Sequence, residues 1–250
     1  ARAVSGETYF GDRLIIAAGG CAGRKLGGTE SGYALLKMLG HDCTALAPSL
    51  VQLRTETDFV RALKGVRADA ALTLKLNGHT AAASEGELQF TEFGVSGPAA
   101  FELSRAVSTS EGEKTLLLDF CRNIPEEGLT ELLTARCARF PALPAEKLLT
   151  GILQSRLGKM LVRRAELDAS AALSTLDAAQ LRRVVGLVKC CALRVSGVMG
   201  MDQAQVTAGG ISTAQFRADT LESRVAPGVF ACGEVLDIDG DCGGYNLQWA

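Results

Sequence analysis

The stretch LIIAAGG, residues 14–20, decides the fold class of this 250-residue chain. It is a short apolar run with Asp12-Arg13 before it and a glycine pair at its end, which is typical of a strand buried on both faces of a parallel sheet. A glycine-rich loop follows, after which Thr29 is placed to cap a helix over residues 30–39 that ends at Gly40. A strand, a glycine-rich loop and a helix in this order make half of an α/β unit.

The end of the chain has the same character as its beginning. In GVFACGEVLDIDGDCGGYNLQWA, residues 228–250, a second short apolar strand over residues 229–232 stops at a glycine. The pair Gly243-Gly244 then opens a helix that the chain does not complete. The first and last segments therefore predict one domain built from residues 1–44 and 206–250, with its C-terminal helix truncated.

The middle of the chain differs from both ends. LTLKL at residues 72–76 alternates between apolar and polar positions, Asn77-Gly78 is a strong hairpin turn, and residues 87–93 and 114–120 are further predicted strands. Leucines at three- and four-residue spacing predict helices over residues 128–140, 144–167 and 177–188. We therefore expect an inserted α+β domain over residues 45–205, β-rich at about 45–122 and 190–205 and helical at about 125–189.

Composition and charge argue against several classes of partner. The 26 basic and 28 acidic residues leave a formal charge of −2, and no run of like charge indicates a surface for nucleic acid or membrane. The apolar runs are far shorter than the roughly 20 residues of a transmembrane helix, and the N-terminus lacks the layout of a signal peptide. We expect a cytoplasmic protein that binds neither nucleic acid nor a membrane.

The eight cysteines and two histidines do not predict a metal site. The cysteines are scattered without a C-x-x-C pair, so neither a zinc ribbon nor a thioredoxin-like pair is indicated, and reduced, mostly buried thiols are expected. A dithiol formed by Cys232 and Cys242 is the alternative. His41 and His79 follow a helix-end signal and a turn signal, so both are expected to be structural.

Three stretches carry a resemblance to a known family. They are LIIAAGG with GGTESGYALLKMLGH near the start, LQFTEFGVSGPAAFELS at residues 88–104, and VTAGGIS with LESRVAPGVFACGEVLDIDGDCGGYNLQWA at the end. They resemble the HI0933-like family of flavoproteins, which includes aminoacetone oxidase-like and bile-acid dehydro-reductase-like enzymes. The resemblance covers nearly the whole chain. It implies an α/β fold with pieces of a Rossmann-like FAD-binding domain that flank an insert of coiled β-structure and a small helical bundle.

One part of the family pattern is missing from these residues. Members of the family begin with a strand, a G-x-G-x-x-G turn and a helix that hold the FAD pyrophosphate. The segment GGCAGRKLGG, residues 19–28, has the glycines without that spacing. We therefore expect this chain to be an internal piece of a longer flavoprotein.

The cofactor-binding residues that we expect fall into three groups. The resemblance implies that the glycine pair after the first strand lets backbone approach the FAD, and that the last turn presents N–H groups to the pyrimidine end of the flavin. The acidic loop between them offers carboxylates to ribityl or ribose hydroxyls, and the Asn246 side chain is an added donor. The ten residues are Ala18, Gly19, Gly20, Gly233, Glu234, Asp237, Gly243, Gly244, Tyr245 and Asn246. Tyr245, Leu247 and Trp249 are expected to pack on the flavin ring or in the core.

The acidic loop has a second interpretation. Glu234, Asp237 and Asp239 lie close together, as in a calcium loop. An EF-hand also needs a bidentate glutamate at its twelfth position, where this chain has Gln248 or Ala250. No metal site is therefore predicted.

Glu92, in FTEFGVSGPAA, is the candidate for a catalytic residue. The family usually has histidine at that position, and a glutamate acts as an acid or base when burial raises its pKa. A solvated glutamate at a strand end is the alternative. Ser96 is expected to cap the helix that follows, with Pro98 in its first turn.

Two functions from different classes follow from these features. The resemblance implies an FAD-dependent oxidoreductase that transfers hydride to or from a small organic substrate between the flavin domain and the insert. NADH or NADPH is a candidate reductant. The alternative is a binding or interaction module formed by the insert, without chemistry.

Overall fold

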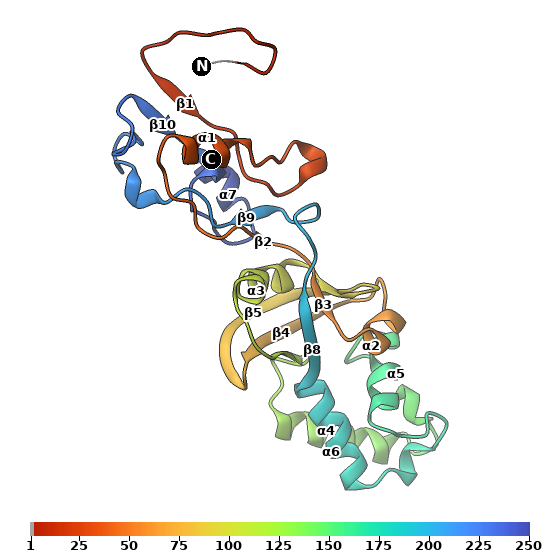
Figure 1. Cartoon of the computed structure of the whole chain (residues 1–250). Helices are drawn as coiled ribbons and strands as arrows, with labels where there is room; N and C mark the ends of the chain where they lie inside the picture. The colour runs from red at the N-terminus through yellow and green to blue at the C-terminus, as the bar shows by residue number, and fades with distance from the viewer. Residues whose placement is uncertain (1–2) are drawn as a thin grey trace. The chain divides into compact units, whose positions relative to one another are not determined.

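The computed structural model describes residues 3–250 and divides into two compact units (Figure 1). The flanking unit consists of the chain up to Ser49 together with Gly200–Ala250. The inserted unit is Leu50–Met199. Each unit has its own hydrophobic core, so each is described by itself.

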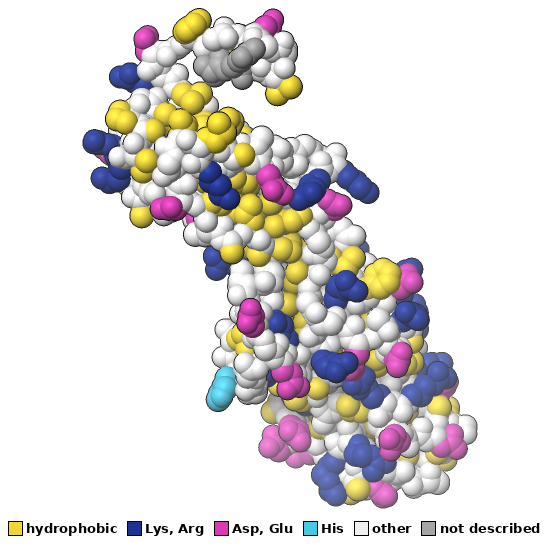
Figure 2. All heavy atoms as spheres, in the orientation of Figure 1, with side chains coloured by type: hydrophobic (Ala, Val, Ile, Leu, Met, Phe, Trp, Pro, Cys, Tyr) yellow, Lys and Arg dark blue, Asp and Glu magenta, His cyan; other side chains and the backbone are white. Residues whose placement is uncertain are grey.

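A two-stranded parallel sheet lies at the centre of the flanking unit. Strand β1 (Leu14–Ile16) pairs in parallel with β10 (Val229–Ala231), so the predicted parallel arrangement is confirmed. The predicted burial of the first strand on both faces is wrong in the described residues. Ile16 is buried, whereas Ile15 is 67% exposed, because in residues 3–250 no other strand or helix covers its face of the pair. Figure 2 shows hydrophobic side chains at the surface around the position of β1.

Helix α1 (Ser31–Met38) packs on this sheet through its buried residues Gly32, Tyr33 and Leu36. The chain leaves the helix through Gly40, whose φ of 93° is the left-handed conformation expected at that place. Strand β2 (Ala47–Ser49) pairs antiparallel with β9 (Val206–Ala208). Because these strands pair with each other, residues 45–49 and 200–205 belong to the flanking unit and not to the insert.

The inserted unit is built around a closed antiparallel barrel of six strands in the order β3-β6-β5-β4-β7-β8. The strands are β3 (Leu53–Thr55), β4 (Arg67–Leu76), β5 (His79–Phe90), β6 (Gly94–Ser96), β7 (Lys114–Asp119) and β8 (Cys191–Val198). Leu72, Leu74, Leu116 and Leu118 alternate toward the interior and are almost completely buried. The turn between β4 and β5 is the predicted Asn77-Gly78 hairpin, and both residues have positive φ.

Five helices complete the inserted unit and share one core with the barrel. They are α2 (Thr57–Ala62), α3 (Pro98–Thr109), α4 (Glu126–Arg139), α5 (Ser155–Arg164) and α6 (Ala178–Lys189). In Figure 1, α3 lies against β5, and α4 and α6 lie together beyond the barrel. The unit thus mixes strands and helices, and its β part closes on itself.

Two predicted helix boundaries are wrong. The single helix expected over residues 144–167 is divided into a short 3-10 turn at Ala145–Lys147 and α5, because Gly151 has a φ of 81° and Gln154 caps a new helix. Ser96 belongs to β6, and Gly97 is the N-cap of α3. A side chain at position 97 is excluded because its Cβ would lie 2.7 Å from the Glu87 carbonyl oxygen.

Candidate site at the carboxyl ends of the parallel strands

The segments that follow β1 and β10 leave the sheet at the same edge, since the two strands are parallel. Gly20, after β1, lies directly against Glu234, after β10. A Cβ on Gly20 would lie 2.7 Å from Glu234 Cδ and 2.6 Å from Thr207 Oγ1. Two predicted site residues are therefore brought together by the fold, and the glycine is required for their close approach.

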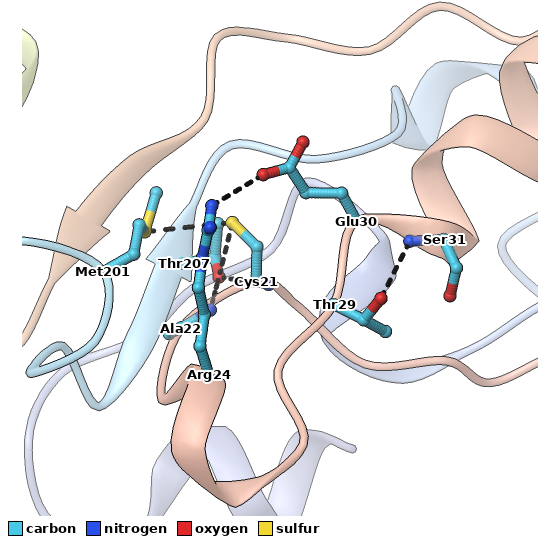
Figure 3. A network of polar contacts seen from close by, with 8 residues as sticks. All are labelled: Cys21, Ala22, Arg24, Thr29, Glu30, Ser31, Met201 and Thr207. Atoms are coloured by element: carbon cyan, nitrogen blue, oxygen red, sulfur yellow. Dashed lines mark hydrogen bonds and ion pairs between the residues drawn. The ribbon is translucent and has the colours of Figure 1, made fainter.

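Thr207 contacts both segments, and Figure 3 shows its contacts with the first of them, at Cys21 and Ala22. Its Oγ1 accepts hydrogen bonds from the backbone N–H groups of Cys21 and Ala22, each at 3.0 Å. Its own N–H donates to Glu234 Oε1 at 2.7 Å. The Thr207 side chain is only 1% exposed. Thr207 lies in the segment VTAGGIS, residues 206–212, two positions before the pair Gly209-Gly210, and this glycine pair was the signal that the sequence offered.

Tyr33 and Cys21 complete a buried cluster beside Thr207. Both residues are 2% exposed, and the Tyr33 hydroxyl donates to the Glu234 carbonyl oxygen at 3.5 Å. Burial raises the pKa of Tyr33 far above its usual value, and the nearby Cys21 thiol and Glu234 carboxylate raise it further. Tyr33 is therefore a neutral phenol. The Cys21 thiol lies 3.8 Å from the thioether sulfur of Met201.

The residues just before Gly20 leave open space next to the strand end. Gly19 has a φ of 70°, and a Cβ built there would meet nothing within 4 Å. Ala18 is exposed, and its methyl group packs against Gly32 of α1. Gly233 also has a positive φ, of 75°. The predicted glycines thus border a region where backbone is accessible.

Asp237 has contacts separate from those of Glu234. Its Oδ2 accepts a hydrogen bond from Thr44 Oγ1 at 2.9 Å, and its N–H donates to the Ile211 carbonyl oxygen. Thr44 Oγ1 also accepts from the Gly210 N–H at 2.9 Å. Asp237 therefore fixes the acidic loop to residues 210–211.

The C-terminal turn has the predicted glycines but uses its polar groups locally. Gly243 and Gly244 both have positive φ, and Gly244 is the N-cap of α7 (Tyr245–Trp249). Asn246 Nδ2 donates to the carbonyl oxygens of Gly240 and Asp241 at 2.9 and 3.2 Å, and its Oδ1 accepts from the Gly240 N–H. Both amide hydrogens of Asn246 are thus committed to the loop that precedes the helix.

The aromatic and apolar side chains of α7 do not pack in the core. Tyr245, Leu247 and Trp249 are 66%, 86% and 41% exposed. Core packing, one of the two places expected for them, is therefore wrong in this structure. The helix spans five residues, and its apolar side chains extend beyond the core of the flanking unit.

Glu92 does not have the environment of a catalytic acid or base. It forms an ion pair with Lys64 at 2.9 Å, and its side chain is 44% exposed. The hydrogen bond and charge of Lys64 lower the pKa of Glu92. Burial was the condition for a raised pKa, and it is not met. Glu92 is a solvated glutamate near the end of β5 and lies in the inserted unit.

His41 is structural, as predicted. It is buried, its ring stacks on Phe216 with centroids 5.0 Å apart, and Nδ1 lies 3.0 Å from the Leu36 carbonyl oxygen. Since a carbonyl oxygen only accepts, Nδ1 donates to it, and Nε2 lies within hydrogen-bond distance of Ser223 Oγ, at 2.7 Å. The histidine therefore fastens the end of α1 to the segment before β10.

The cysteines form no disulfide, and their burial is mixed. Cys21, Cys121 and Cys191 are buried, Cys190 is exposed, and the other four are half-buried. The expectation of mostly buried thiols therefore holds for three of the eight. In residues 3–250 no group of three or more potential metal ligands gathers, and none of the helices there is long and apolar enough to cross a membrane.

A cavity of about 560 Å³ lies in the inserted unit, and Asp69, Cys121 and Arg122 are among its lining residues. It is bordered by β4, the end of β7 and α5. Its Arg122 forms a bidentate ion pair with Asp69 and a second ion pair with Glu85, so the charge of the guanidinium is compensated. All of its lining residues belong to the inserted unit.

Comparisons with known proteins agree with the features above. The model of the HI0933-like protein Rossmann domain matches residues 2–250. The chain is 36% identical over 248 residues to a 3-dehydro-bile acid delta(4,6)-reductase of Clostridium scindens. It is 27% and 28% identical to ribosomal RNA dihydrouridine synthases of Escherichia coli and Haemophilus influenzae.

These alignments cover 98%, 99% and 95% of this chain. They cover 61%, 60% and 57% of the three relatives, so the chain spans about three fifths of their length. The family model covers nearly every residue, including both glycine-rich segments at the strand ends. The chain therefore belongs to the HI0933-like family.

Proposed function

We propose that this chain forms part of a flavin-dependent oxidoreductase that acts on a small organic substrate. The observation that carries the proposal is the parallel pairing of β1 with β10, which brings the segments after both strands to one edge. Ligands of Rossmann-like folds bind at the carboxyl ends of parallel strands. Family membership and the relative named as a bile-acid reductase support the same class of reaction.

The residues at this edge fit a cofactor of this kind. Ala18 and Gly19 leave backbone accessible, and a Cβ on Gly19 or Gly244 would meet nothing within 4 Å. Glu234 has one carboxylate oxygen held by the Thr207 N–H, which leaves the other able to accept from a ribityl or ribose hydroxyl. A flat ring and a polyhydroxyl chain are the groups that such a surface accommodates.

Each candidate residue has a defined part in the proposal. Gly19, Gly20 and Gly233 let backbone approach the cofactor, while Glu234 and Asp237 bind hydroxyl groups. Gly243 and Gly244 orient backbone N–H groups of the last turn toward the pyrimidine edge of the flavin. Asn246 shapes the loop around them, since its side-chain amide is already bonded to that loop. Tyr245 is exposed and available to cover the ring.

The bound flavin supplies the chemistry, which is transfer of a hydride or an electron pair. The protein orients the cofactor and limits the access of water. The proposal requires no acid or base from the flanking unit. Tyr33 stays protonated beside Glu234.

The proposal is tested on the natural protein, purified with whatever flanking sequence its gene encodes. We expect the absorbance of bound flavin, bleached by dithionite and by NADH or NADPH as candidate reductants. A folded, colourless protein would contradict the proposal and favour the non-catalytic binding module instead.

A pair of matched variants tests the site itself. Glu234 and Glu222 each accept one backbone N–H, from Thr207 at 2.7 Å and from Gly228 at 3.0 Å. We expect Glu234→Gln to weaken flavin binding, because it removes the charge that attracts the hydroxyl groups. Glu222→Gln is the control and should leave binding unchanged. Equal effects of the two substitutions would exclude a direct role for Glu234.

RNA is the second candidate substrate, since two relatives are named for ribosomal RNA. Over residues 136–194 the chain has 11 basic and 4 acidic residues, although its total charge is close to zero. Figure 2 shows several of these basic side chains at the surface of the helical part. Such a local surplus favours binding to phosphates.

The RNA candidate predicts binding to protein-free ribosomal RNA that weakens steeply with salt. Replacing the exposed Arg163 and Arg182 by glutamine should weaken this binding. Arg13→Gln, in the flanking unit, is the control. RNA binding of equal strength by the unsubstituted protein, the variant at Arg163 and Arg182, and the Arg13→Gln control would exclude RNA as the substrate. Binding that does not depend on salt would exclude it as well.

A further inference from the structure

We infer that Thr207 is a positioning residue of the flavin site, which it serves by fastening the segment after β1 to the segment after β10. This inference rests on the proposed function. Thr207 lies outside both segments and belongs to β9. It is not among the ten cofactor-binding residues predicted from the sequence.

The contacts of Thr207 reach both segments at the same time. The Oγ1 atom accepts from two consecutive N–H groups, those of Cys21 and Ala22, and the backbone N–H donates to the Glu234 carboxylate. These partners are 185 and 186 residues away on one side and 27 residues away on the other. One residue therefore contacts two segments that are far apart in the sequence and helps to hold them together.

The surroundings leave this residue little freedom. Thr207 is 1% exposed, and its Oγ1 would be only 2.6 Å from a Cβ on Gly20. Loss of the hydroxyl would leave the buried Cys21 N–H and the half-buried Ala22 N–H without their acceptor. Buried N–H groups strongly favour a partner, so the segment after β1 would move to find one.

Such a movement would displace the groups that are proposed to meet the flavin. Gly19 and Gly20 directly precede Cys21, and Glu234 is held by the same threonine. A change at Thr207 is therefore expected to alter the environment of the flavin without touching the flavin. A changed flavin environment distinguishes a positioning role of Thr207 from a general contribution to stability.

The test compares Thr207→Val with Thr207→Ser in the natural protein. Valine keeps the shape and removes the acceptor, whereas serine keeps it. Thr220→Val is the control, because Thr220 is exposed and its hydroxyl accepts only a local hydrogen bond from Glu222. The measurements are the dissociation constant and midpoint potential of the flavin, its absorption spectrum, and hydrogen exchange of the amides of Cys21 and Ala22.

We expect Thr207→Val to raise the flavin dissociation constant about tenfold or more, which is the effect of one or two lost hydrogen bonds. It should also shift the midpoint potential and speed exchange at Cys21 and Ala22. Serine should restore all of these values. If valine does not fold, Thr207→Ala replaces it, because alanine also removes the acceptor of both N–H groups and adds no second methyl group to the buried position.

An unchanged dissociation constant and potential in the valine or alanine variant would overturn the inference. A serine variant as impaired as the valine variant would overturn it as well. These results are distinct from failure of the proposed function, in which the unsubstituted protein itself would bind no flavin.

Discussion

Replacing Gly32 by alanine tests how closely α1 packs on the segments that follow β1 and β10. Gly32 is buried in the first turn of the helix. A Cβ at this position would lie 2.8 Å from Ala18 Cβ and 3.0 Å from Val235 Cγ2. Carbon atoms attract best at about 3.5–4.0 Å, so both contacts would be repulsive.

Two opposite effects decide whether Gly32→Ala raises or lowers the free energy of unfolding. Alanine is more favourable than glycine in a helix by about 0.5–1 kcal/mol. Overpacking of a well-packed core typically costs about 1–3 kcal/mol. Because Ala18 and Val235 have short side chains that cannot move aside, we expect repulsion to win and the flanking unit to lose about 1–2 kcal/mol of stability.

Gly186→Ala is the matched control. Gly186 lies within α6, and a Cβ there would meet nothing within 4 Å. Only the helix preference operates at this position, so this substitution should stabilise the inserted unit by about 0.5–1 kcal/mol.

The assay is urea denaturation followed by circular dichroism, with hydrogen exchange of the α1 and α6 amides to separate the two units. The double variant Ala18→Gly with Gly32→Ala removes one of the two close contacts and should recover part of the lost stability. A Gly32→Ala protein as stable as the unsubstituted protein would refute the close packing of α1. So would a double variant that is less stable than the single one.

Four further predictions concern other parts of the chain. Ser223→Ala removes the partner of His41 and should lower the free energy of unfolding by about 1–3 kcal/mol, as measured by urea denaturation; an unchanged midpoint would contradict the buried network. Iodoacetamide should label the exposed Cys190 but not Cys191 in the native protein, as checked by mass spectrometry of peptides. Burial raises the pKa of the Cys191 thiol to about 11. The neutral buried thiol therefore contributes fully to stability below about pH 9, and this contribution is lost as the pH rises to about 11. Cys191→Ala should reduce this loss of stability at alkaline pH. Glu92→Gln should leave the rate of flavin reduction unchanged, because its ion pair is exposed to solvent; a large decrease would return Glu92 to the site.

Local signals in the sequence predicted several elements well. The third predicted helix begins at Asp177, and the structure places this residue as the N-cap of α6 in a capping box with Gln180. Asn77-Gly78 predicted the hairpin turn because both residues adopt positive φ easily. These features depend on residues within a few positions of one another, so their physics is contained in a short stretch of chain.

Features that depend on distant partners were not predictable. Closure of the barrel requires β8 to pair with both β3 and β7, and Leu53 faces Val198 across this contact. Gly97, and not Ser96, caps α3 because the Glu87 backbone approaches it from another strand. The lowered pKa of Glu92 likewise depends on its ion pair with Lys64, which is 28 residues away in the sequence.

The sequence by itself determined the two apolar strands that end in glycines, the position of the insert between them, and the family to which the chain belongs. Only the tertiary structure decided which of those glycines are crowded and which are open, and that Thr207 joins Cys21 and Ala22 to Glu234. The physical reason is that a strand or a turn is stabilised by its own neighbours, whereas a candidate site is formed by groups from separate segments, which meet only when the core has packed.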